Sequence, residues 1–88
     1  MIVEEDLEEV GTISHYFTKI GVAIIDLKTT LKVGDKICVK GSTTDFSQKV
    51  LSMQIEHKNV EKAEAGKSIG LKLDNRAREG DVVYKVLE

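Results

Sequence analysis

The sequence predicts an all-β protein, a small closed β-barrel of six or seven strands. Short runs of β-branched and aromatic residues recur along the chain with turn residues between them. No segment with helical periodicity is long enough to organise a fold. The chain has 88 residues, which is enough for one hydrophobic core. A barrel is favoured because closing the sheet protects the strand edges of so small a domain.

Local patterning places the individual strands. Residues 36–40 alternate strictly, with Ile37 and Val39 on one face. Residues 46–57 form a longer run whose phase slips near Ser52, which predicts one long strand with a bulge. The other predicted strands cover residues 10–17, 21–27, 68–73 and 81–87.

The links between strands are marked by glycine, because proline is absent. Gly34, Gly66 and Gly80 each precede an alternating run, where a positive-φ turn can lead the chain into a strand. One link has a different composition: residues 59–65 read NVEKAEA, which predicts a short helical turn. Such a helix would have about two turns and could only connect strands.

The domain organisation follows from the distribution of charge. Residues 1–9 hold five acids and no base, whereas residues 10–88 hold ten acids and thirteen bases. We therefore expect an acidic N-terminal arm over 1–9 and a single barrel domain over 10–88. The arm is either a solvated tail that favours solubility or a segment that folds back over a basic face of its own domain.

Composition excludes several classes of protein. The longest apolar run, Val22 to Ile25, is far shorter than the roughly 20 residues of a membrane span. No basic-then-apolar leader opens the chain, which favours a cytoplasmic protein without a membrane partner. The single cysteine, Cys38, allows neither an internal disulfide nor a multi-cysteine zinc site.

The triplet Gly66-Lys67-Ser68 matches the end of a phosphate-binding P-loop, but its surroundings do not. The first glycine of that motif would stand at position 61, which is Glu61. A P-loop also lies between a strand and a helix, whereas here the following segment has a strand pattern. The sequence therefore predicts no nucleotide site and no cofactor.

Catalytic and metal chemistry are also not predicted. His15, Cys38 and His57 lack the close pair spacing of metal ligands. Ser47 and Ser52 lie near His57 in sequence without an acid placed to orient the histidine. We expect no metal, no catalytic residue and a protein that is not an enzyme.

A binding surface is the remaining possibility. Aromatic rings beside bases can stack on nucleotides while lysines contact phosphate. The alternative is that Phe17 belongs to the core, that Tyr16 is half-buried at the barrel rim, and that the lysines only aid solubility. The RNA-binding candidates are His15, Tyr16, Lys19, Lys36, Lys40, Lys49 and Lys58.

Three segments carry a family resemblance: LKVGDKICVKG, QKVLSMQIEHKNVEKAEAGKSIGLKL and REGDVVYKV. Together they resemble the second domain of elongation factor Tu, the β-barrel shared by translational GTPases. The similarity runs from about Val10 to Val86 and includes the Leu-x-Val-Gly-Asp turn at residues 31–35. None of these 88 residues matches the GTPase domain of the family, and the glycine-rich segment keeps only Gly21 within residues 19–26. A similar barrel is appended to some collagenase-like peptidases.

The resemblance implies a non-catalytic binding module, and two classes of partner stay open. The first is RNA, so that the chain would be a stand-alone barrel associated with tRNA, ribosomal RNA or the ribosome. The second is a protein, so that the chain would be an adaptor that docks on a separately encoded enzyme or GTPase.

Overall fold

The computed structural model describes residues 6–87, and every regular element in this part of the chain is a β-strand. The all-β class predicted from the sequence is confirmed. Residues 6–87 contain no helix that could span a membrane. The strands are β1 (Asp6–Phe17), β2 (Val22–Leu27), β3 (Leu31–Lys32), β4 (Lys36–Lys40), β5 (Asp45–Lys49), β6 (Met53–Ile55), β7 (Lys58–Val60), β8 (Lys62–Ala63), β9 (Ser68–Lys72) and β10 (Val82–Leu87).

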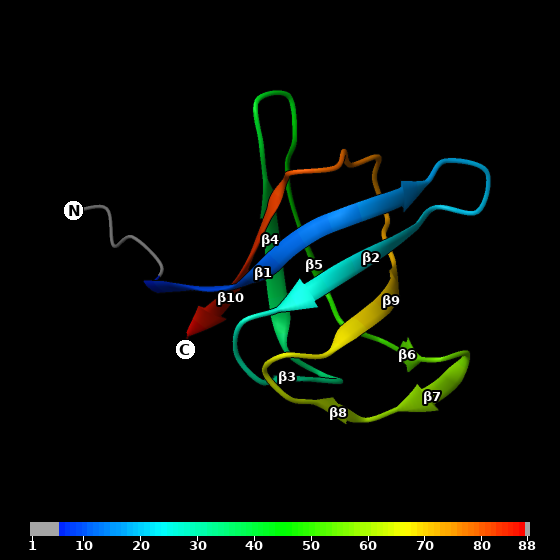
Figure 1. Ribbon diagram of the computed structural model, residues 1–88. Coiled ribbons are helices and arrows are strands. Elements are labelled where there is room, and N and C mark those ends of the chain that lie inside the picture. The colour runs from blue at the N-terminus through cyan, green and yellow to red at the C-terminus, as the bar shows by residue number, and fades with distance from the viewer. Residues whose placement is uncertain (1–5, 88) are drawn as a thin grey trace.

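Eight strands form one sheet in the order β5-β4-β10-β1-β2-β9-β6-β7, and β3 pairs with β8 in a second, two-stranded sheet. All the ladders are antiparallel. The long strand β1 lies at the centre of the large sheet, between β10 and β2. Figure 1 shows β4 and β5 crossing behind β1 and β2, so that the strongly curved sheet surrounds a common interior.

The prediction of a closed barrel is wrong for the described residues. The first and last strands of the large sheet, β5 and β7, do not pair with each other. Instead, the side-chain amide of Gln48 on β5 connects that strand to the chain leaving β9. Its nitrogen donates to the Lys72 carbonyl oxygen at 2.9 Å, and its oxygen accepts from the Asp74 N–H at 2.7 Å. One side chain thus makes the connection that a strand ladder makes in a closed barrel.

The long strand predicted over residues 46–57 is two strands, β5 and β6, separated by residues 50–52. The chain then reverses at Glu56 and His57, which have φ values of 50° and 66°. A two-residue hairpin of the primed type needs positive φ at both positions, and Asn-Gly is its usual sequence. Because Glu-His lacks that signal, the sequence does not predict a turn here.

The helical turn predicted over residues 59–65 is also wrong, since this segment contains β7 and β8. Ala63 is buried and pairs with Leu31 of β3. Leu31 has no exposed surface. A contact between segments about thirty residues apart therefore outweighs the local preference for helix, which is weak over so few residues.

The core is formed by the inward faces of the curved sheet. Alternate residues of β2 and β9 point into it, and β4 supplies Ile37 and Val39 as the 36–40 pattern predicted. The fully buried large side chains include Ile13, Ile25, Leu31, Ile37, Met53, Ile69 and Leu71. Because apolar burial is the main favourable term in folding, this cluster holds the strands in their order.

Two glycines sit where another segment approaches closely. A Cβ atom at Gly11, beside a bulge in the β1–β10 ladder, would lie 2.2 Å from the Asp26 carbonyl oxygen. A Cβ atom at Gly41 would lie 2.0 Å from Oδ1 of Asp81, a buried carboxylate that accepts from the Arg78 N–H. Neither position can accept a side chain without movement of its neighbour.

The acidic arm predicted over residues 1–9 lies partly outside the described residues, which begin at position 6. The following residues belong to β1 and pair with β10. In this stretch Glu8 lies 3.8 Å from the Lys85 ammonium, and Glu9 pairs with Lys28. Some of the excess acid near the N-terminus is therefore compensated by bases of neighbouring strands.

Candidate functional site

The structure distributes the seven predicted contact residues over three separate places. The first group belongs to the β1–β2 hairpin, the second to the β4–β5 hairpin, and the last residue lies at the start of β7. In that order, the groups are His15, Tyr16 and Lys19; Lys36, Lys40 and Lys49; and Lys58.

At the β1–β2 hairpin the aromatic side chains face different surroundings. The His15 Nδ1 atom lies 3.1 Å from the Glu79 carboxylate, and the His15 ring meets Phe17 edge-on at 4.3 Å between centroids. Tyr16 is half-buried and packs against the core, as the alternative interpretation expected. The same interpretation placed Phe17 in the core, which is wrong, because this ring is 44% exposed. Lys19 lies in the exposed turn.

Two of the remaining lysines contribute little to a common site. Lys40 lies 3.4 Å from Asp45, the residue opposite it on β5, so its charge is compensated. Lys58 begins β7, which is the last strand of the large sheet and lies at the β6–β7 hairpin. Figure 1 shows this hairpin far from the turn that joins β4 to β5.

Lys36 and Lys49, in contrast, lie directly opposite each other on β4 and β5. Gly41 and Thr44 exchange both backbone hydrogen bonds at the hairpin end, and Val50 donates to the Asp35 carbonyl. The alternation of an antiparallel ladder then makes Lys36 and Lys49 a non-hydrogen-bonded pair. In such pairs the Cα atoms are about 4.5 Å apart and the side chains are closest.

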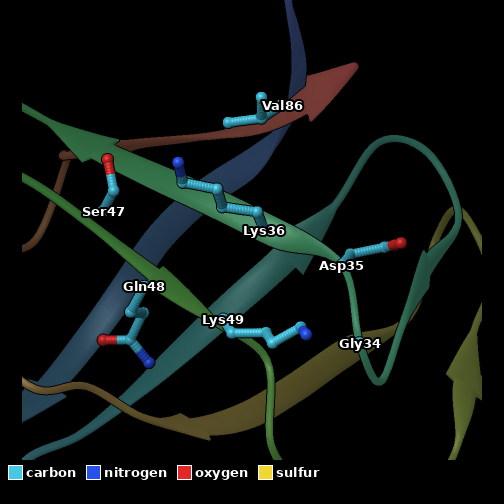
Figure 2. Close-up of a pocket in the computed structure, with 7 residues that line it drawn as sticks. All are labelled: Gly34, Asp35, Lys36, Ser47, Gln48, Lys49 and Val86. Atoms are coloured by element: carbon cyan, nitrogen blue, oxygen red, sulfur yellow. The ribbon is translucent and has the colours of Figure 1, made fainter. Parts of the chain in front are cut away.

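These lysines line a hollow of about 580 Å³, which we call the basic hollow. Figure 2 shows its walls: β4 and β5 supply the two lysines, and Val86 of β10 closes one side. The Lys36 and Lys49 side chains extend in opposite directions along their strands, as two like charges on adjacent stems would. The lining residues are Gly34, Asp35, Lys36, Ser47, Gln48, Lys49 and Val86.

The polar groups of the basic hollow differ in whether they have a hydrogen-bond or ion-pair partner within the protein. Asp35 accepts from the Lys32 N–H at 2.9 Å, and Ser47 lies 3.1 Å from the Cys38 sulfur. The Gln48 amide is hydrogen-bonded to Lys72 at the end of β9 and to Asp74 after it. Neither Lys36 nor Lys49 makes an ion pair with any residue between positions 7 and 87. The hollow therefore offers two ammonium groups to a ligand that carries negative charge.

Both lysines are candidates from the sequence, but local pattern does not predict that they lie side by side. The alternation of 36–40 put Lys36 outward, yet the partner residue on the next strand depends on where the hairpin turns. The turn is Ser42-Thr43, between the paired Gly41 and Thr44, and it has no Asn-Gly signal. Had the turn been recognised, counting outward would have paired Lys36 with Lys49 and Cys38 with Ser47.

The histidines and the cysteine are kept apart by the fold. Cys38 is buried on β4, His15 is on β1, and His57 is in the β6–β7 turn. Within residues 7–87, no group of three or more histidine, cysteine or acidic side chains is placed to hold a metal ion. In the same part of the chain, no histidine is hydrogen-bonded to a serine or to Cys38.

The chain is similar to several known proteins over most of its length. It is 44% identical over 81 residues to the uncharacterized protease MJ0090 of Methanocaldococcus jannaschii, which covers 91% of this chain and 20% of that protease. It is 35% identical over 78 residues to a collagenase of Porphyromonas gingivalis, covering 86% of this chain and 22% of the collagenase. The chain thus spans about a fifth of the length of these curated relatives.

Solved structures share the fold. The C-terminal domain of a Geobacillus thermoleovorans putative U32 peptidase superposes with a TM-score of 0.85 over 91% of this chain and 93% of that domain, at 17% identity. Its selenomethionine variant gives a TM-score of 0.82 at 16% identity, over 86% of this chain and 96% of the other. No protein-family model matches the chain.

These similarities correct the family expectation. The relatives are a protease and a collagenase, and the structural neighbour is a domain of a putative peptidase. The identification as a translation-factor barrel is therefore wrong. The short motifs shared with elongation factor Tu mark turns and strand entries, and such turn chemistry recurs in unrelated β proteins.

The functional expectations attached to that resemblance are also wrong. These were an RNA- or ribosome-associated module and, as its alternative, an adaptor for a separately encoded enzyme or GTPase. Similarity to proteases over nearly the whole chain overturns the translational role. The relatives instead include a collagenase, and a similar barrel is appended to some collagenase-like peptidases.

Proposed function

We propose that this chain is a non-catalytic accessory domain of a U32-type peptidase, and that it contributes a binding surface while another part of such an enzyme cleaves the substrate. The observation that carries the proposal is the 44% identity to one fifth of a protease. A segment that matches only a fifth of an enzyme, and folds like a solved C-terminal domain of a putative peptidase, is compact enough to be a separate unit.

The non-catalytic role is supported by the side chains that the fold brings together. A peptidase needs an activated nucleophile or a metal-bound water, with a base within hydrogen-bond reach. In the described residues, Cys38 is buried with Ser47 as its polar neighbour, and His15 is engaged by Glu79 and Phe17. A lysine-lined hollow is suited to binding rather than to peptide hydrolysis.

An exchange experiment tests the proposal. The segment of the P. gingivalis collagenase that matches this chain is deleted in one variant and replaced by residues 7–87 of this chain in another. Gelatin cleavage is then measured at several substrate concentrations. We expect deletion to lower kcat/KM by about tenfold or more, because the deletion removes part of the binding energy for the substrate. We expect replacement by this chain to restore most of kcat/KM.

The isolated chain is the third arm of this experiment. We expect it to leave gelatin intact even at concentrations well above those of the collagenase. Cleavage by the isolated chain would contradict the non-catalytic role. A folded exchange protein that is as impaired as the deletion variant would contradict the role as an accessory domain.

A further inference from the structure

We infer that the basic hollow binds the side-chain carboxylate of an acidic peptide segment. The proposed role in a peptidase supplies the peptide class of ligand, and the inference rests on that role to this extent. The geometry of Lys36 and Lys49 supplies the chemistry.

The first step concerns the free protein. Like charges directly opposite each other on an antiparallel ladder are destabilising. Lys36 and Lys49 occupy such a pair, in the position where side chains approach most closely. Lys40, on the same face, has an acid opposite it. Among residues 7–87, no carboxylate forms an ion pair with Lys36 or Lys49. A ligand that supplies a carboxylate is therefore attracted by both ammonium charges.

The second step concerns the charge of the ligand. Asp35 also lines the hollow, and in Figure 2 its carboxylate points away from the two ammonium groups toward the turn. With one acid and two lysines, the lining has a formal charge of one positive unit. Asp35 repels any anion, but it repels a dianionic phosphate more strongly than a singly charged carboxylate, so the carboxylate matches this lining better.

The third step concerns the uncharged part of the ligand. Val86 is 7% exposed and forms an apolar wall beside the methylene stems of the lysines. A glutamate or aspartate side chain can therefore lay its methylene groups on this wall with its carboxylate between the two lysine stems. Binding then requires the ammonium groups, which extend in opposite directions in Figure 2, to swing toward that carboxylate. The Ser47 hydroxyl on the same face adds a further hydrogen-bonding group.

The test uses the 88-residue chain and a fluorescein-labelled peptide, Gly-Glu-Gly-Glu-Gly, blocked at both ends. Anisotropy at low salt gives the affinity, and amide shifts in ¹⁵N-labelled protein locate the site. We expect saturable binding that weakens with added salt, with shifts at Gly34, Lys36, Ser47 and Lys49. The blocked glutamine counterpart should not bind.

Two double variants make the test specific. Lys36→Gln/Lys49→Gln should weaken binding on the order of tenfold. Its thermal midpoint should equal or exceed that of the native chain, because the like-charge pair is gone. The matched control, Lys58→Gln/Lys67→Gln, removes the same charge elsewhere and should change the affinity less than about twofold.

Several results would overturn the inference. These are equal binding of the glutamine peptide, equal losses in both double variants, shifts that map away from the hollow, or no saturable binding. Binding of pentaglycine with a free C-terminus in place of the blocked glutamate peptide would also overturn it, by assigning the site to a chain end. Because no collagenase is present, these outcomes are independent of the gelatin experiment.

Discussion

Gln48 and Lys72 are joined across the open side of the large sheet by a hydrogen bond of 2.9 Å from the Gln48 amide nitrogen to the Lys72 carbonyl oxygen. The amide oxygen of the same side chain accepts from the Asp74 N–H at 2.7 Å. Gln48 is 9% exposed, so both bonds lie mostly away from water. This one side chain therefore connects β5 to the end of β9 and the residues that follow it, where no ladder joins the two strands.

Replacing Gln48 with leucine should destabilise the protein by about 2 kcal/mol, because it leaves two backbone groups without their partner. Urea denaturation followed by circular dichroism gives the free energy of unfolding. A loss below about 0.5 kcal/mol would show that water replaces the amide without cost and that the bridge is not structural.

Gln48→Glu has the same shape but cannot donate to Lys72 when ionised. In this variant the neutral carboxyl is favoured in the folded state, so its pKa there should exceed the ordinary value of about 4.3. Its stability relative to the native protein should therefore be highest at low pH and fall as the pH rises through that raised pKa. Denaturation of both proteins at about pH 4 and pH 7 measures this difference, and a pH-independent difference would contradict the assigned donor.

Gly11→Ala should destabilise the protein by about 2–3 kcal/mol, because its Cβ would lie 2.2 Å from the Asp26 carbonyl and force β1 and β2 apart. Gly70→Ala is the matched control within the same sheet. Its Cβ would have no neighbour closer than 3.8 Å. This variant should be neutral or more stable by about 0.5 kcal/mol. Equal thermal midpoints for the two variants would refute the close approach at Gly11.

Gly41 and Asp81 should be strongly coupled. Gly41→Ala displaces the Asp81 carboxylate from the Arg78 N–H, which should cost about 1–3 kcal/mol, as should Asp81→Ala. Once the carboxylate is gone, the alanine at position 41 has space, so the double variant should be little worse than Asp81→Ala alone. A double-mutant cycle of unfolding free energies measures the coupling. Additive losses would mean that the alanine clashes with something other than Asp81.

Much of the fold could be predicted because its strands are locally patterned. Ile37 and Val39 of β4 point into the core as the alternation of 36–40 predicts, and β2, β9 and β10 lie close to the predicted ranges. The errors fall where local pattern does not decide. Glu56 and His57 form a tight turn without turn residues, and Ala63 becomes a strand residue through pairing with Leu31. The open side of the sheet is not predicted from local pattern, because the Gln48 bridge depends on tertiary geometry.

The candidate site could be predicted only in part, for a related reason. An outward lysine at position 36 follows from alternation, but its neighbour is set by strand register, and register follows turn length. The Ser42-Thr43 turn has no sequence signature, so Lys36 and Lys49 remained separate candidates. The kind of protein could not be decided from short turn motifs, because β folds of different function share them.

The measurement that tests the central claim most directly is kcat/KM for gelatin cleavage by the exchange protein, compared with the deletion variant of the same collagenase. An accessory domain predicts that the exchange protein regains most of the activity lost on deletion, while the isolated chain has none. A folded exchange protein no more active than the deletion variant, or cleavage by the isolated chain, would contradict the account.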